Sequence, residues 1–183
     1  MHPLLVLLPI LIPLTGAVIA LLLRPYRRIQ GGLTLAAMLT SLAISGALLW
    51  TVWQNGEPVV YQSGGWATPF GISLVGDLLA AVFVVMTQLV MVMGIIYALG
   101  SQDSVGRYPA FFVLFLTLAT GLTGAMLTGD LFNMYVFAEL LVISGTVLTA
   151  VSAFAGRGQF LKAMLMTCFG LGLATVGQDA ASD

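Results

Sequence analysis

Glu139 is the residue whose type and position in this sequence best suit chemistry. It lies in an almost wholly apolar run, 131–153, that is long enough to cross a bilayer as a helix. Glu139 comes eight residues after Leu131, so it lies about 12 Å below the end of that helix, inside a hydrocarbon layer roughly 30 Å thick. A carboxylate at this depth is costly and is typical of an ion or proton path. Glu139 is therefore the leading candidate for proton transfer.

The residues that share a helical face with Glu139 define its expected surroundings. Helical spacing puts five residues on that face: Phe132, Tyr135, Val136, Ile143 and Thr146. The apolar members exclude water and favour the neutral carboxylic acid, whereas a nearby cation would favour the carboxylate. A carboxyl group between these two influences can gain and lose a proton. The alternative is that Glu139 only forms a hydrogen-bonded link between helices.

Lys162 is the second candidate, as a member of a proton relay. It lies near the inner end of an apolar run, 160–176, and differs in depth from Glu139 by roughly 16 Å if both helices are straight. Waters or another residue would have to bridge them, and a lysine that reaches the membrane surface is the alternative. Asp77 and Asp130 each precede an apolar run and are expected to cap helices, with proton entry as the alternative at Asp77.

The composition is that of an integral membrane protein. Of 183 residues, 60 % are hydrophobic and 7 % are charged, whereas a soluble domain has roughly a quarter of its residues charged. A net charge of −1 argues against a nucleic-acid partner. Cys168 and His2 are each the single residue of their type, so we expect no bound metal, and no nucleotide or flavin motif indicates a cofactor.

The apolar runs predict an all-α polytopic protein that forms a single transmembrane domain. The expected spans are residues 3–23, 31–53, 77–99, 109–128, 131–153 and 160–176, with an outer loop at 54–76. With the N-terminus outside, all six Lys and Arg residues fall on the inner side, as the positive-inside rule requires. In the outer loop, VVYQ and the later WATPFGISLV predict a small hairpin, with an irregular loop as the alternative.

Two features predict how these spans pack. Pro9 and Pro13 lie within the first span and predict a bend that neighbouring helices support, with a hinge as the alternative. The fourth span is rich in small residues over 119–125, which predicts close packing against the fifth span. The alternative is that Thr120 and Thr123, within that stretch, hydrate a proton route.

Three segments carry a resemblance to a known family: GGWATPFGISLVGD, YPAFFVLFL and above all LTGDLFNMYVFAELLVISG. They resemble the N-terminal part of the D subunit of Mrp-type sodium/proton antiporters and, more loosely, the antiporter-like subunits of complex I and membrane-bound hydrogenases. The resemblance covers almost the whole chain and is weakest in the first two spans and beyond Gly156. It implies a fourteen-helix fold with two inverted five-helix repeats, in which the family glutamate falls on Glu139 and a family lysine on Lys162.

The same resemblance implies a function in a bacterial or archaeal inner membrane. Glu139 would take part in exchange of protons for sodium or another monovalent cation, together with other subunits of a complex. The chain ends part-way through the first repeat, so we expect a truncated member or a fragment. The alternatives are a proton-pumping, non-redox subunit of an oxidoreductase and an inactive membrane scaffold.

Overall fold

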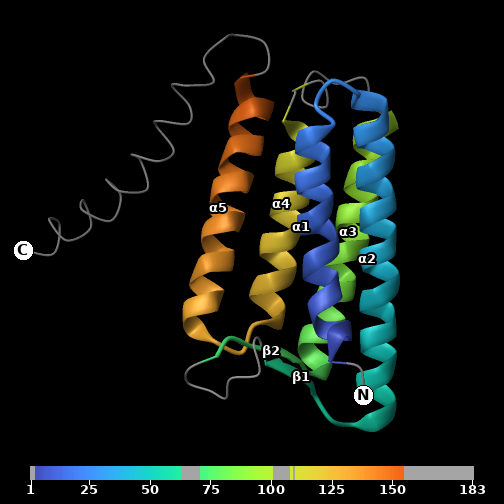
Figure 1. The fold of residues 1–183 in the computed structure, drawn as a ribbon, viewed down its shortest axis with the longest axis vertical. Helices are drawn as coiled ribbons and strands as arrows, with labels where there is room; N and C mark the ends of the chain where they lie inside the picture. Colours follow the sequence, from blue (N-terminus) through green and yellow to red (C-terminus); the bar gives the residue numbers. More distant parts are fainter. Residues whose placement is uncertain (1–2, 63–70, 101–107, 109, 155–183) are drawn as a thin grey trace, which may run out of the picture.

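A computed structural model describes residues 3–62, 71–100, 108 and 110–154 of the chain, and in this part it contains five helices and one hairpin (Figure 1). In chain order the elements are α1 (Leu4–Leu22), α2 (Arg27–Asn55), β1 (Val59–Gln62), β2 (Ser73–Gly76), α3 (Leu78–Gly100), α4 (Phe111–Leu127) and α5 (Leu131–Phe154). Four of the helices are long and apolar enough to cross a membrane, and α4 is a shorter apolar helix. The predicted all-α polytopic class is confirmed.

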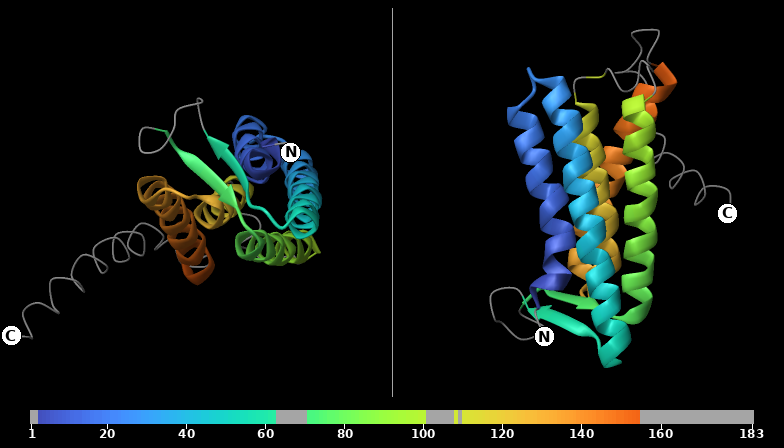
Figure 2. Two further views of the ribbon diagram at one scale, coloured as in Figure 1. Left: turned by 90° about the horizontal axis from the view of Figure 1, so that it is seen from below. Right: turned by 90° about the vertical axis from the view of Figure 1, so that its right-hand side faces the viewer.

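The first four helices form a bundle, and α5 lies outside it. Helix α1 packs against α2 and α4, and α3 packs against α2 and α4, whereas α5 packs against α4. Figure 2 shows α5, in orange, beyond α4 on the side away from α2. The core has one cluster around Met38, Ile95 and Leu116 and a second around Val6, Leu48 and Leu127. Helix α5 is therefore held by a single neighbouring helix among the described residues.

The helices cover the predicted spans, with one difference in length. Helix α2 begins at Arg27 instead of residue 31 and ends at Asn55, so its 29 residues measure about 43 Å. That length exceeds the hydrocarbon thickness of roughly 30 Å, so its ends extend into the interfacial regions. The predicted span 160–176 lies outside the described residues.

The predicted hairpin is present at the end of the bundle where α1 begins. Strands β1 and β2 are antiparallel, with Val59 opposite Gly76, and the second strand is confined to the end of the predicted segment. Val59 and Leu74 are buried with Val6 and Leu48 in the second core cluster. The hairpin is thus part of the folded core and closes one end of the bundle.

The prolines of α1 are supported by a neighbouring helix, as the sequence predicts. Pro13 has no N–H, which leaves the carbonyl of Pro9 without its helical donor. The hydroxyl of Ser41, on α2, donates to that carbonyl at 3.0 Å. At the other end of α1, Gln30 Nε2 donates to the carbonyl of Ala20 at 2.6 Å. Two side chains of α2 therefore satisfy main-chain groups of α1 that would otherwise be unpaired.

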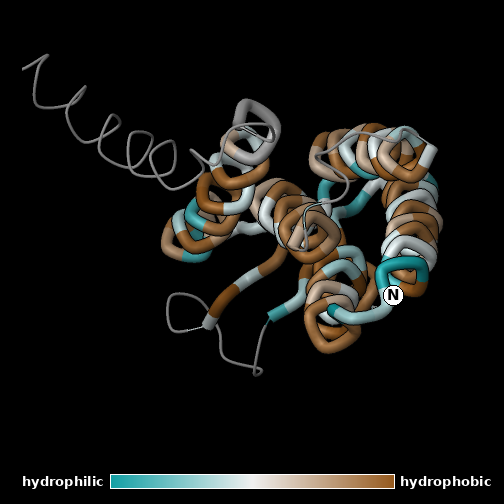
Figure 3. Tube along the Cα trace, turned by 90° about the horizontal axis from the view of Figure 1, so that it is seen from above, coloured by the Kyte–Doolittle hydropathy of each residue, from teal (hydrophilic) through white to brown (hydrophobic). Residues whose placement is uncertain are grey.

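The outer surfaces of the helices are hydrophobic, and charges gather at the two ends. Figure 3 shows hydrophobic residues all around the helices and not only on their inner sides. The charged residues that the structure describes, apart from Glu139, are Arg24, Arg27 and Arg28 at the end where α1 meets α2, and Glu57, Asp77 and Asp130 at the hairpin end. This separation has the direction that the positive-inside rule requires if the hairpin end faces outward.

Candidate functional site

Glu139 lies on α5, and its side chain is exposed. Helix α5 begins at Leu131, so Glu139 is eight residues, or about 12 Å, from its hairpin end. The α5 residues buried against α4 include Asn133 and Ser144, which are 7 % and 1 % exposed. Glu139 comes two residues after Phe137, which contacts α4. The two side chains therefore point about 200° apart around the helix. The structure thus places Glu139 on the face of α5 that is turned away from the bundle.

The predicted neighbours of Glu139 share this outward face. Phe132, Tyr135, Val136 and Ile143 are exposed with it, and Phe132 is 70 % exposed. Tyr135 lies one helical turn before Glu139, and the two side chains interact. Within the described residues no other helix lies against Glu139, so the alternative of a hydrogen-bonded link between helices is not seen there. Any group that covers Glu139 in a membrane must therefore lie outside the residues that the structure describes.

Two glycines of α4 determine how closely α5 approaches. A Cβ atom on Gly121 would lie 2.9 Å from the backbone nitrogen of Leu141 and 3.0 Å from the carbonyl oxygen of Phe137. A Cβ atom on Gly124 would overlap the ring of Phe137. The predicted packing of the small-residue stretch against the fifth span is therefore confirmed. Small residues at such contacts allow helix backbones to approach closely in a membrane.

The turn between α4 and α5 is anchored to the hairpin. The N–H of Gly129 donates to the carbonyl of Ser73 at 2.9 Å, and Thr128 forms an antiparallel bridge with Leu74. Asn133 Nδ2, in the first turn of α5, donates to Thr128 Oγ1 at 3.0 Å. These contacts fix the start of α5 and therefore the depth of every residue along it, Glu139 included.

Both predicted acidic caps are confirmed. Asp77 Oδ1 accepts a hydrogen bond from the N–H of Ala80 at 2.7 Å at the start of α3. Asp130 Oδ1 accepts one from the N–H of Phe132 at 3.2 Å at the start of α5. Each carboxylate thereby satisfies a main-chain donor that has no partner within its helix. Asp77 also lines two surface hollows at the hairpin end.

A buried polar pair between α3 and α4 was not predicted. Gln88 is fully buried, and its Nε2 donates to Thr123 Oγ1 at 2.9 Å, while its Oε1 has no partner among the described residues. Thr123 and Thr120 also donate to carbonyls one turn earlier in α4. The signal was available in the sequence, because Gln88 is a polar residue within the apolar run 77–99. The pair joins the two helices, and the alternative role of the threonines in a proton route stays untested.

The other candidates give no further site within the described residues. Lys162 lies outside them, so its distance from Glu139 stays a prediction. In the part of the chain that the structure describes, no group of three or more His, Cys, Asp or Glu residues could hold a metal ion. The candidate site therefore consists of Glu139 with Tyr135 on an exposed helix face.

Comparison with known proteins finds relatives among the membrane subunits of antiporters and oxidoreductases. The sequence is 39 % identical over 146 residues to the D subunit of the Na⁺/H⁺ antiporter of Bacillus subtilis, an alignment that covers 78 % of this chain and 29 % of that protein. It is 35 % identical over 175 residues to the N subunit of the NADH-quinone oxidoreductase of Desulforudis audaxviator, covering 93 % of this chain and 33 % of that protein. No protein-family model matches the sequence. Over most of its length the chain is similar to antiporter-like membrane subunits.

Solved structures agree with this assignment. A chain of the membrane-bound sulfane sulfur reductase, an archaeal respiratory membrane complex, has a TM-score of 0.73 and 28 % identity, covering 94 % of this chain and 36 % of its own length. A chain of the Mrp complex from a Dietzia species has a TM-score of 0.71 and 25 % identity, covering 92 % of this chain and 34 % of its own length. The protein is thus a multi-pass protein of the cell membrane that spans about a third of the length of these relatives.

Proposed function

We propose that this chain is part of a multisubunit antiporter that exchanges protons for a monovalent cation, and that Glu139 carries the proton. The observation that supports this most directly is the position of Glu139. Among the described residues, Glu139 is the one charged residue that lies within a span away from the ends of that span, and Tyr135 lies one helical turn before it. Intramembrane carboxyl groups of this kind typically serve ion or proton paths.

The outward orientation of Glu139 determines what the complete site requires. A carboxyl group that faces only hydrocarbon has no group beside it with which it could exchange a proton. To release the proton again, it needs a cation, water or a polar residue on the far side of α5. We propose that further helices, from a longer chain or from another protein of the complex, supply this second layer and that Lys162 is one member of the relay.

Replacement of Glu139 by glutamine in the assembled complex tests the proposal. Glu139→Gln keeps the size and polarity of the side chain but removes the titratable group. We expect it to abolish sodium-dependent proton movement in everted membrane vesicles, measured with a pH-sensitive dye. Asp130→Asn is the matched control, because it removes a carboxylate from the same helix outside the span and keeps a capping residue. Unchanged exchange in Glu139→Gln would leave only a scaffold role.

A respiratory complex is the second candidate. The alignment with the oxidoreductase protein covers more of this chain than the alignment with the antiporter protein, 93 % against 78 %. In that case the chain would move protons without redox chemistry of its own, and Glu139→Gln would reduce proton pumping driven by substrate oxidation. Neighbouring genes for small antiporter subunits would favour the first function, and genes for iron–sulfur subunits would favour the second.

A further inference from the structure

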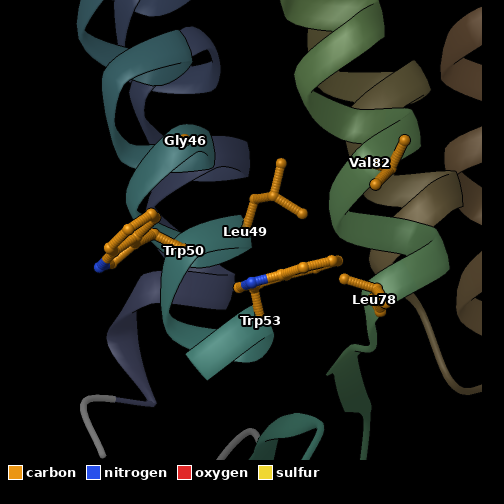
Figure 4. A pocket seen from close by; sticks show the side chains of 6 residues that line it. All are labelled: Gly46, Leu49, Trp50, Trp53, Leu78 and Val82. Carbon is orange, nitrogen blue, oxygen red and sulfur yellow. The ribbon is translucent and has the colours of Figure 1, made fainter. Parts of the chain in front are cut away.

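The surface between α2 and α3 at the hairpin end has a hollow that takes no part in the proposed proton path. It measures about 440 Å³ and is lined by Gly46, Leu49, Trp50, Trp53, Leu78 and Val82 (Figure 4). All six residues are apolar or aromatic, and Trp50 and Trp53 are 65 % and 70 % exposed. Ligand pockets typically have volumes of about 300–1,000 Å³ and apolar walls, so this hollow is large enough for part of a lipid molecule.

The position of the hollow matches the upper part of a lipid acyl chain. Gly46 lies nine residues before the end of α2 at Asn55, or about 13 Å along the helix, and Trp53 lies within the last turn. Exposed tryptophans are typical of the level where the hydrocarbon meets the headgroups. The hollow therefore begins at that level and extends into the hydrocarbon.

A second hollow of about 310 Å³ adjoins the first and is acidic. Trp53 and Leu78 line both hollows, and the second one also includes Glu57 and Asp77. Among the described residues, those at the hairpin end carry carboxylates and no Lys or Arg. The two hollows together therefore suit a ligand with an apolar tail and a headgroup whose outer end is cationic, whereas a headgroup with a net negative charge would be repelled.

We propose that this groove binds one phospholipid with an ethanolamine headgroup. The acyl chain lies in the apolar hollow between α2 and α3, and the ammonium group lies against Glu57 and Asp77. Trp53, at the junction of the two hollows, packs against the region between head and tail. The indole ring suits this position because it combines a large apolar face with one N–H donor.

Native mass spectrometry of the detergent-solubilised complex, titrated with phosphatidylethanolamine or phosphatidylglycerol, tests the site. Gly46→Leu places a branched side chain in the hollow, and a Cβ atom at Gly46 meets nothing within 4 Å. Gly32→Leu is the matched control, since Gly32 lies on the same helix near its opposite end and also has open space. We expect Gly46→Leu to lose one bound phosphatidylethanolamine per copy and Gly32→Leu to retain it.

The headgroup preference is tested with Glu57→Gln combined with Asp77→Asn, in which asparagine keeps the helix cap. We expect the unmodified protein to prefer phosphatidylethanolamine by about two- to thirtyfold, the range for two solvent-exposed ion pairs, and the double variant to lose that preference. Equal lipid counts in the unmodified protein and Gly46→Leu would overturn the proposal, as would a covering helix from another protein of the complex. Equal binding of the two lipids by the unmodified protein would also overturn it.

Discussion

Gly121 of α4 offers a sharp test of how α5 is positioned. In Gly121→Ala the new Cβ atom would lie 2.9 Å from the nitrogen of Leu141, whereas ordinary contact begins at 3.4 Å. The difference requires α5 to move away by about 0.5 Å, because the atoms in conflict are main-chain atoms and no change of side-chain rotamer relieves them. Such overpacking costs about 1–3 kcal/mol in typical cores.

The matched control is Gly145→Ala, at the same interface but on α5. Its Cβ atom would lie 3.6 Å from the side chain of Leu118, which is ordinary contact. Both substitutions replace a glycine within a helix by alanine, a gain of about 1 kcal/mol in helix propensity that cancels between them. The difference in free energy of unfolding between the two variants therefore measures the steric overlap at Gly121 alone. We expect Gly121→Ala to be less stable than Gly145→Ala by about 1–3 kcal/mol.

The assay is the free energy of unfolding of the full-length protein in mixed micelles, obtained by titration with a denaturing detergent and followed by circular dichroism. Proton flux in vesicles is measured in parallel, because a shift of α5 also displaces Glu139. If the two variants are equally stable within about 0.5 kcal/mol, the close approach of α4 and α5 does not hold α5 in place. The orientation of Glu139 would then need a different physical cause.

Three further predictions concern polar contacts and use the same unfolding assay. Ser41→Ala should cost about 1–3 kcal/mol, because a proline carbonyl loses its donor, whereas Thr40→Ala, on the exposed side of α2, should stay within about 0.5 kcal/mol. Thr123→Val should cost about 1–3 kcal/mol, since it leaves both polar ends of Gln88 unpaired, whereas Gln88→Met should cost less. Asp77→Ala should cost about 1 kcal/mol and Asp77→Asn only a few tenths, because asparagine also caps. Equal effects within any of these pairs would contradict the role assigned to that contact.

The positions of the helices could be predicted because each span is an apolar run of membrane length. The start of α2 was missed for a physical reason. Arg27, Arg28 and Gln30 are polar and fall outside the apolar run, yet they continue the helix. Gln30 is buried, and its amide donates to the end of α1. A tertiary hydrogen bond of this kind leaves no trace in hydrophobic periodicity, so the sequence placed the helix start four residues too late.

The depth of Glu139 in the membrane could be predicted from the sequence, but the side of α5 on which it lies could not. Counting residues from Leu131 gives the depth of Glu139, because Asp130 caps the helix where the sequence indicates. Periodicity identifies the residues that share its face, but it does not tell which face meets a neighbour. That choice depends on Gly121 and Gly124, whose missing side chains admit α5 on the side opposite Glu139. The two glycines of α4 thus determine on which side of α5 Glu139 lies.

Because Glu139 points away from α4, its proton partner has to lie on the outer side of α5. Helix α5 is held by α4 along its length and by the hairpin at its start, while its outward face carries the carboxyl group and large apolar side chains. Tyr135 lies one turn away on the same helix, but a partner within that helix gives the proton no path away from it. Transfer needs a second partner across the outward face. We therefore expect that variants of residues packed on that face in the full assembly will alter proton movement as strongly as Glu139→Gln, whereas variants on the α4 side will act through stability.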